Sequence, residues 1–474
     1  MGSAQGLAIF TIGASSKDVS VETGSTGTVT YTVRNTSGIN MPNMRYLPSA
    51  SASRSGGTCG STMTVGASCT VILTIRAPAK EGEHFYVTIR VCGFKGTVCS
   101  TTNEANRVSV VVVAVTVFAY VTNQTSTTVS VINTSTDAVT ATIAVSVDDP
   151  KFMSLSPTGD RLYVGGYSGS SSTLLSVINT ATNTETATVT LSDNGGDGIT
   201  ITPDGSKLFA VSNEGGLCDV VDTATNTVVA SPAITGGAGT DYAPSMLPDG
   251  SKVYAPRQIN GNLTVISTTT NAVVANVAGV TSTTGVAFLP NSSKGYVAGV
   301  SQAVVRIVNP ATDTVTGTIA VGTNAQYIGI TPDGSAAYVT NLGSNNVSVI
   351  NTATDTVTAT IAAPSGNVFS GAYVVFTPDG TQAYLTNFGA DTITVFNVAA
   401  STVSATVSVG DQPVAAAVLP SGSKVYVPNQ NAGTVSVMST TTKTITATIT
   451  VGTTPLRVMF NSSSGPRNLP PWAL

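Results

Sequence analysis

Residues 332–361 read PDGSAAYVTNLGSNNVSVINTATDTVTATI, and this stretch decides the fold because variants of it recur through most of the chain. Each copy has a Pro-Asp-Gly-type turn, a strand with an aromatic residue, a Thr-Val-Ser-Val-Ile-type strand and a Thr-rich strand. The aromatic markers are Tyr120, Tyr163, Phe209, Tyr254, Tyr296, Tyr338, Tyr384 and Tyr426. A period of roughly 40–50 residues with four short strands is typical of a propeller blade. We therefore predict an all-β fold with an eight-bladed β-propeller.

The two ends of the repeat region complement each other. The first repeat lacks an innermost strand, because Tyr120 follows the preceding domain almost directly. The last repeat is followed by an additional apolar segment, PLRVMF at residues 455–460. We expect this C-terminal strand to complete the first blade and close the ring, burying Leu456, Val458 and Phe460. Closure would remove two open sheet edges.

The Pro-Asp-Gly turns contain aspartates that resemble catalytic candidates. Proline fixes φ, aspartate accepts hydrogen bonds from the nearby backbone, and glycine adopts positive φ without strain. The aspartates in question are Asp204, Asp249, Asp333 and Asp379. Their spacing is explained by turn formation, so we assign them no catalytic role.

The first quarter of the chain differs from the repeats. Residues 7–114 alternate apolar and polar side chains in short runs between turn residues, which is typical of a β-sandwich. The segments GTCG at 57–60 and VGASCT at 65–70 resemble those of bacterial immunoglobulin-like surface domains. The predicted domains are an immunoglobulin-like β-sandwich at 1–115, a propeller at 116–464 and a Pro-rich tail at 465–474.

Four of the five cysteines lie in the first domain. Cys59, Cys69, Cys92 and Cys99 permit three disulfide pairings, of which we prefer the local ones, 59–69 and 92–99. Their spacings differ from those of zinc ribbons, and the chain's single histidine, His84, has no evident companion ligand. Disulfides would place the protein in an oxidising compartment.

Charge and hydropathy limit the partners. The formal net charge is −4 and the isoelectric point is near 5.0, with no cluster of Lys or Arg, so we expect no nucleic-acid partner. The longest apolar run, residues 108–121, is shorter than the roughly 20 residues of a spanning helix, so no transmembrane segment is expected. The first residues, MGSA, lack a charged and apolar leader, which we interpret as a processed or added start.

The sequence motif YVTN at residues 120–123 and 338–341, with variants at 384–387 and 426–429, supports a family resemblance. The chain resembles the YVTN-repeat β-propellers, which include archaeal surface-layer proteins and bacterial secreted or cell-surface proteins. This resemblance implies a binding or scaffold role and a secreted, extracellular or cell-surface location, with the periplasm as an alternative. The repeats at Phe209, Tyr254 and Tyr296 depart from the motif.

Residues suited to catalysis are few. The lone histidine lies outside the repeats, and no Gly-x-Ser-x-Gly, phosphate-binding loop or His-Glu-x-x-His motif occurs. Cys218 aligns with Val129, a core-facing position, so we expect a buried and inert thiol. These observations predict that the protein is not an enzyme.

The loops that lead into the innermost strands should converge at one mouth of the central channel. They are polar, and aspartates crowd onto three adjacent repeats. The predicted ligand-binding residues are Asp149, Asp197, Asp241, Asn324, Gln326 and Gln412, with Arg257 from a nearby loop or strand. Residues 193–198 partly resemble a calcium loop but lack its downstream glutamate, so we predict no cofactor, with calcium as the alternative.

These inferences combine into one functional hypothesis. The predicted protein is a non-catalytic secreted or cell-surface binding or adhesion protein, whose channel mouth binds a glycan, a peptide or a protein. The alternatives are a lyase-like propeller enzyme, which rests on fold analogy, and a structural surface-layer or coat subunit that self-assembles.

Overall fold

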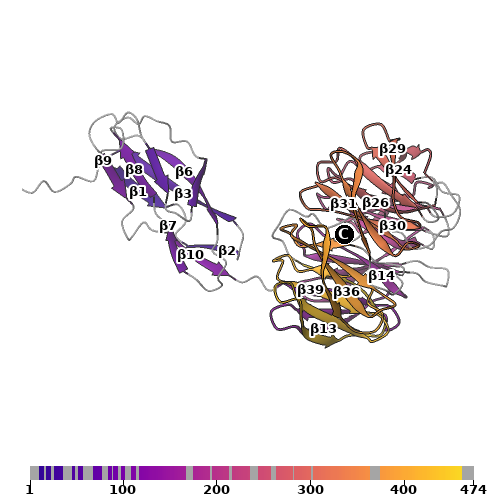
Figure 1. The fold of residues 1–474 in the computed structure, drawn as a ribbon. Helices are drawn as coiled ribbons and strands as arrows, with labels where there is room; N and C mark the ends of the chain where they lie inside the picture. Colours follow the sequence, from indigo (N-terminus) through magenta and orange to yellow (C-terminus); the bar gives the residue numbers. More distant parts are fainter. Residues whose placement is uncertain are drawn as a thin grey trace, which may run out of the picture. The chain divides into compact units, whose positions relative to one another are not determined.

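The computed structural model describes residues 117–461 except for 167–173, 193–194, 213–215, 235–243, 258–262, 281, 300–302 and 363–373. Side chains of residues 195–197 also lie outside the described part. For the first domain the structure describes only the backbone of the strands between residues 10 and 113. The chain divides into two compact units, residues 1–116 and 117–474 (Figure 1).

Within residues 117–461 the described strands form eight four-stranded antiparallel sheets, and no helix is found among them. From the innermost strand outward, the first blade is β42 (Pro455–Phe460), β11 (Phe118–Asn123), β12 (Thr128–Asn133) and β13 (Ala138–Ala144), and the second is β14 (Pro150–Leu155), β15 (Arg161–Gly166), β16 (Leu174–Asn179) and β17 (Thr184–Thr190). The third blade is β18 (Gly195–Ile201), β19 (Lys207–Ser212), β20 (Cys218–Asp222) and β21 (Thr227–Ala230), and the fourth is β22 (Ser245–Met246), β23 (Lys252–Ala255), β24 (Leu263–Ser267) and β25 (Val273–Val277).

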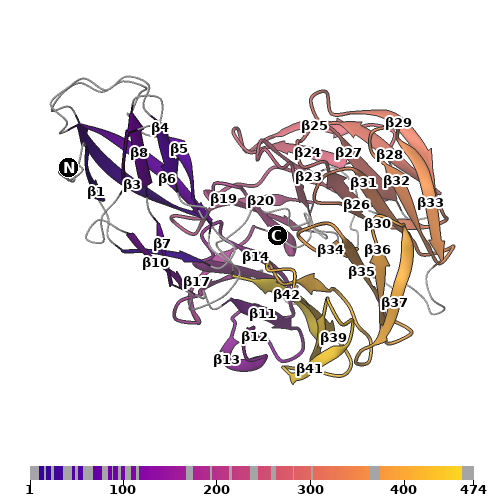
Figure 2. The same ribbon diagram turned by 60° about the vertical axis from the view of Figure 1, so that its left-hand side comes forward.

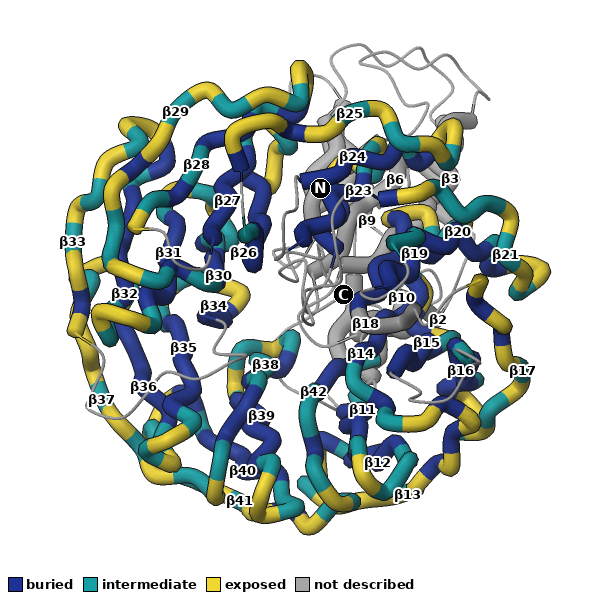
Figure 3. The backbone as a smooth tube through the Cα atoms, turned by 90° about the vertical axis from the view of Figure 1, so that its right-hand side faces the viewer, coloured by how far each residue is buried: buried dark blue, intermediate teal, exposed yellow. Residues whose placement is uncertain are grey.

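The remaining blades repeat this order. The fifth blade is β26 (Thr283–Phe288), β27 (Gly295–Gly299), β28 (Val304–Asn309) and β29 (Thr314–Ala320), and the sixth is β30 (Ala325–Ile330), β31 (Ala336–Asn341), β32 (Asn346–Asn351) and β33 (Thr356–Ala362). The seventh blade is β34 (Val375–Phe376), β35 (Gln382–Asn387), β36 (Thr392–Asn397) and β37 (Thr402–Ser408), and the eighth is β38 (Ala417–Val418), β39 (Lys424–Asn429), β40 (Thr434–Ser439) and β41 (Ile445–Thr450). The innermost strands surround the ring axis and the outermost strands form its circumference (Figure 3).

The C-terminal strand closes the ring, as predicted. β42 pairs antiparallel with β11, with Val458 opposite Val121 and Phe460 opposite Ala119. The backbone N–H of Gln124 also donates to the Thr454 carbonyl at 2.9 Å. The eight-bladed prediction is thereby confirmed.

The burial expected for the closing strand is corrected in one respect. Val458, Met459 and Phe460 are buried, whereas Leu456 is only half-buried. An innermost strand packs against the neighbouring blades on both faces, so the period-2 alternation of a half-buried strand does not apply to it. The buried set therefore includes the adjacent residues 458–460.

The core lies between blades. The aromatic marker of every repeat is fully buried, and clusters such as that of Tyr426, Phe460, Val121 and Ile449 join residues of adjacent sheets. The outermost strands alternate between exposed and half-buried positions (Figure 3). In β29 and β33 the exposed positions are mostly threonines. Side chains on both faces of the inner strands thus hold the blades together.

The first unit is also built of strands. They are β1 (Phe10–Ala14), β2 (Asp18–Glu22), β3 (Thr26–Asn35), β4 (Arg45–Pro48), β5 (Ala52–Gly56), β6 (Ser68–Arg76), β7 (His84–Val87), β8 (Ile89–Gly93), β9 (Val98–Thr101) and β10 (Val108–Val113). They form sheets ordered β1-β3-β6-β5, β2-β10-β7 and β4-β8-β9. The immunoglobulin-like topology stays a prediction.

The predicted disulfides belong to this first unit. Cys92 and Cys99 occupy directly opposite positions on β8 and β9. Cys59 lies outside the described residues, as do the side chains of Cys69, Cys92 and Cys99. The disulfide pairings therefore stay predictions.

Candidate functional site

The two ends of the ring are built from different kinds of connection. Because consecutive strands of a blade are antiparallel, the turns after the innermost and third strands lie at one end. These turns keep nearly constant lengths, as in residues 202–206, 331–335 and 377–381. We call this the uniform end; the opposite end, with the turns between the second and third strands and the crossovers between blades, we call the variable end.

Length variation is concentrated at the variable end. From the third strand to the next aromatic marker, the chain takes 35 residues between Val349 and Tyr384 and 34 between Val220 and Tyr254, but 31 between Ile307 and Tyr338. The crossovers within 363–374 and 231–244 are therefore three to four residues longer than the crossover 321–324. Likewise, the second and third strands are joined by residues 167–173 in one blade but by 342–345 in another. Of the predicted ligand-binding residues, Asp149, Asp241, Asn324 and Gln412 belong to crossovers, and Asp197 and Gln326 to the first residues of the innermost strands that follow. Arg257 belongs to the connection 256–262 between a second and a third strand.

Three predicted site residues share an unusual backbone conformation. Asp149, Asn324 and Gln412 have φ values of 49°, 56° and 55°, in the left-handed region that non-glycine residues rarely adopt. The carbonyl of Asn324 accepts from the Leu342 N–H at 2.9 Å, and that of Gln412 from the Gln430 N–H at 2.8 Å. At Asn324 and Gln412 this position therefore forms a turn that joins the crossover to the connection between the second and third strands. The three side chains are half-buried.

The other predicted site residues fall in different surroundings. Gln326 lies on the innermost strand β30 and is half-buried, and its carbonyl accepts from the Thr284 hydroxyl of the preceding blade at 2.7 Å. Arg257 is only 1% exposed, and its guanidinium donates to the Ser212 carbonyl at 2.9 Å. The structure thus places Arg257 in the interior instead of on an exposed loop, because it occupies the motif position that Asn holds in other blades.

The aspartates predicted to crowd onto three adjacent repeats, which include Asp148 and Asp193 besides the predicted site residues, lie partly outside the described residues. Asp241 and the side chain of Asp197 lie outside them, so only Asp148 and Asp149 can be placed, the first exposed and the second half-buried. Among the described residues, no group of three or more His, Cys, Asp or Glu side chains could hold a metal ion.

The asparagine of the YVTN motif has a structural role. Asn341 is 1% exposed, and its amide donates to Asn346 Oδ1 at 2.8 Å and to Ser348 Oγ at 2.9 Å. Asn123, Asn387 and Asn429 make the equivalent pair of bonds. Gly322 packs against this side chain, since an added Cβ would lie 2.7 Å from Asn341 Cβ. The motif therefore joins the second strand, the third strand and the crossover.

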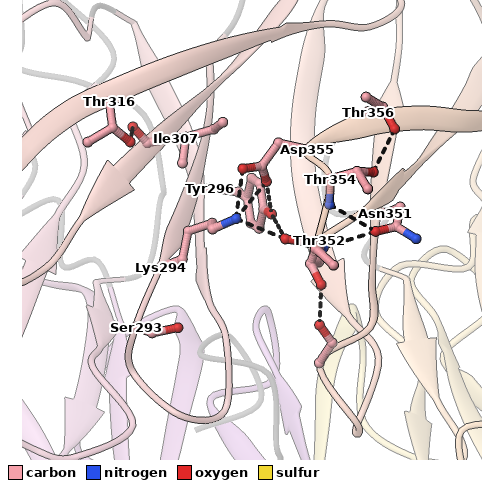
Figure 4. A network of polar contacts seen from close by, with 12 residues as sticks. Ser293, Lys294, Tyr296, Ile307, Thr316, Asn351, Thr352, Thr354, Asp355 and Thr356 are labelled. Atoms are coloured by element: carbon pink, nitrogen blue, oxygen red, sulfur yellow. Dashed lines mark hydrogen bonds and ion pairs between the residues drawn. The ribbon is translucent and has the colours of Figure 1, made fainter.

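A polar network at the uniform end, which the sequence analysis missed, links neighbouring blades (Figure 4). The Lys294 ammonium lies 2.7 Å from Asp355 Oδ2 and donates to the Thr352 carbonyl at 2.8 Å. The Tyr296 hydroxyl donates to Asp355 Oδ1 at 2.6 Å. Burial raises the pKa of Tyr296, and the hydrogen bond to Asp355 raises it further. Lysine two residues before the marker, with aspartate in the next repeat, was the available sequence signal.

The arrangement of Lys294, Tyr296 and Asp355, which we call the blade clamp, recurs at two further interfaces. At one of them it consists of Lys252, Tyr254 and Asp313. At the other it consists of Lys424, Tyr426 and Asp137. At the interface that follows Phe209, Lys207 donates to Asn271 Oδ1 at 2.8 Å. Three interfaces at the uniform end therefore carry an ion pair, and a fourth has a lysine that donates to a neutral amide.

The aspartates of the Pro-Asp-Gly turns have the role expected of them. Asp333 Oδ1 accepts from Thr331 Oγ1 at 2.7 Å and from the Ser335 N–H at 3.0 Å, and Gly334 has φ +74°. The bond from the Ser335 N–H, followed by that from Thr331, lowers the pKa of Asp333. These carboxylates are engaged in turn formation.

Cys218 is fully buried among Phe209, Val220 and Ile234. Burial, with a smaller effect from Asp219, raises the pKa of its thiol. The thiol is therefore protonated and inaccessible, as expected.

Comparisons with known proteins concern the propeller. Residues 320–458 match the family model "Lactonase, 7-bladed beta-propeller", which spans less than a third of this chain. The described strands form eight sheets where that model has seven. No curated protein matches. No helix in the described part is long and apolar enough to cross a membrane.

Similar solved structures share the fold at low identity. One is "Dihydro-heme d1 dehydrogenase NirN in complex with DHE", with a TM-score of 0.59 and 14% identity, covering 72% of this chain and 74% of that one. Another is the "Cps50 (Swd1) beta-propeller domain" of Myceliophteria thermophila, with a TM-score of 0.50 and 10% identity, covering 61% and 96%. The Kuenenia stuttgartiensis hydrazine synthase has a TM-score of 0.49 and 19% identity, covering 61% and 95%.

These findings correct one prediction. We expected no enzymatic role because the sequence has one histidine and no catalytic motif. The lactonase family model contradicts that expectation, since it describes an enzyme family and matches three consecutive blades, and the dehydrogenase also shares the fold. The comparisons and the strand topology together establish that residues 117–461 form a β-propeller of a type that enzymes also use.

Proposed function

We propose that this is a secreted or cell-surface protein of the YVTN-repeat type whose propeller binds a glycan, a peptide or a protein at the variable end. The observation that supports this proposal is that the connections between strands vary in length at the variable end and stay nearly constant at the uniform end. Loops of variable length on a rigid repeat scaffold are where binding specificity usually resides. The half-buried Asp149, Asn324 and Gln412 supply polar groups there.

A glycan array, read with and without calcium, tests this proposal. The informative variant is Asp149→Gly/Asn324→Gly/Gln412→Gly, because glycine removes the side chains and still adopts the left-handed turn. We expect it to lose ligand binding and to keep its melting temperature within a few degrees.

Ser292→Gly is the matched control. Ser292 also has positive φ, 60°, but lies at the uniform end, so its replacement should leave binding unchanged. Equal binding by the triple variant and the wild type would place the ligand elsewhere.

Hydrolysis of a lactone at the same end is the second candidate, favoured by the family match over residues 320–458. Opening the ring of a lactone consumes water and releases a carboxylic acid, so a pH-stat detects turnover without a chromophore. We expect acid release from γ- or δ-lactones that the triple variant abolishes. Release at the uncatalysed rate by the wild type would exclude this candidate.

A further inference from the structure

One blade interface at the uniform end lacks the clamp and contains a cleft instead. The position of Lys294 is held by Ala336 in the next blade, and the position of Asp355 is held by Ser401. A cleft of about 570 Å³ lies there, between the blades of β31 and β35. Its lining includes Asp333, Ala336, Tyr338, Asn397, Val398 and Ser401.

The cleft keeps most of the groups that surround an ammonium in the clamp. The Tyr338 hydroxyl donates to the Val398 carbonyl at 3.3 Å, and this carbonyl is the counterpart of the Thr352 carbonyl that accepts from Lys294. The Tyr338 ring corresponds to that of Tyr296, whose centroid lies 5.9 Å from the Lys294 ammonium. The carbonyl and the phenol hydroxyl therefore remain, while the lysine is replaced by a methyl group. The Tyr338 ring itself is buried and packs against Phe376 and Phe396.

The charge of the lining suits a cation. Its one ionisable acid is Asp333, whose carboxyl has a lowered pKa, and no Lys or Arg is among the lining residues. A carboxylate beside a carbonyl and hydroxyl groups attracts an ammonium and repels an anion. At the other interfaces without a Lys–Asp pair, a larger side chain holds the position of Ala336: Phe118, Arg161, Lys207 or Gln382.

We propose that this cleft binds an alkylammonium group, from either a free diamine or the lysine side chain of another polypeptide. The ammonium would occupy the place that Lys294 fills at the preceding interface, with its alkyl chain beside Ala336. This site lies at the uniform end and is independent of the ligand site proposed above.

The test is isothermal titration calorimetry of the full chain with 1,5-diaminopentane and with an acetylated, amidated Gly-Lys-Gly peptide. Pentan-1-ol and the matching norleucine peptide are the controls without charge. We expect saturable binding of the diamine, the lysine peptide or both, with one site per chain. Binding of only one identifies the source of the ammonium, and binding of neither overturns the proposal.

Variants at two interfaces make the test specific. Ala336→Lys should fill the cleft and reduce affinity at least about tenfold, whereas Ser401→Asp should raise it about three- to tenfold by restoring the carboxylate. Lys294→Ala should create a second site beside Asp355 and change the stoichiometry from one to two. Unchanged affinity in Ala336→Lys, with that variant folded by circular dichroism, would refute the assignment.

Discussion

The Lys424 ammonium lies 2.7 Å from Asp137 Oδ2, although the two residues are 287 positions apart in the chain. This ion pair joins the last blade to the first, and the Tyr426 hydroxyl donates to the same carboxylate. Closure of the ring thus uses both the C-terminal strand and the clamp that links internal blades.

The closing clamp should contribute measurably to stability. Lys424→Ala and Asp137→Asn should each lower the free energy of unfolding by about 1–2 kcal/mol, because both side chains are largely buried and share hydrogen bonds. The double variant should cost less than the sum of the two, measured by urea denaturation. Additive costs would show that the pair is not coupled.

The closing strand β42 should contribute more to the stability of the propeller than the closing clamp does. Burial of Val458, Met459 and Phe460, at about 1.5–3 kcal/mol each, contributes at most about 9 kcal/mol. Deleting residues 450–474 should therefore lower the melting temperature markedly, measured by calorimetry. Deleting only 465–474 is the control and should have no effect, whereas equal melting of both truncated chains would contradict closure by β42.

Removing the asparagine of the YVTN motif should lower the free energy of unfolding. Asn341→Ala leaves Ser348 Oγ and Asn346 Oδ1 without their buried donor, which should cost about 1–3 kcal/mol in the free energy of unfolding. Thr360→Ala, on the exposed face of β33, is the control and should change stability by less than about 0.5 kcal/mol. Similar values for both would remove the structural role assigned to the motif.

Stability should fall in alkaline solution. Burial raises the pKa of Tyr120 from 10.0 to about 12, so above pH 10 the folded chain keeps a proton that the unfolded chain releases. The free energy of unfolding therefore decreases as pH rises from 10 to 12. Tyr120→Phe, which reproduces the natural Phe209, should reduce this slope in denaturation curves measured across that range. An unchanged slope would show that Tyr120 does not titrate in this way.

The cysteines of the two units should behave differently. Peptide mapping without reduction should recover Cys92 linked to Cys99, which are opposite each other on neighbouring strands. Cys218 should resist alkylation until the chain unfolds, because it is buried and its pKa is raised. Recovery of Cys92 linked to Cys59 or Cys69 would refute the local pairing.

The sequence alone was sufficient for the number of blades, the closing strand and the role of the turn aspartates. Each of these depends on local chemistry that repeats with a constant period. Pro332, Asp333 and Gly334 specify a turn whatever surrounds them, and the missing innermost strand of the first repeat requires residues 455–460 to supply it.

Other features depended on how the blades pack around the ring. Lys294 lies beside Asp355 because adjacent sheets place residues about 60 positions apart side by side. The cleft lies at an interface where the small Ala336 takes the place of that lysine. Burial of Arg257 and the left-handed backbone of Asn324 were likewise hidden, since polarity in a sequence does not distinguish a solvated loop from a constrained turn or an interior position. Only the tertiary structure decides which residues from separate repeats come into contact.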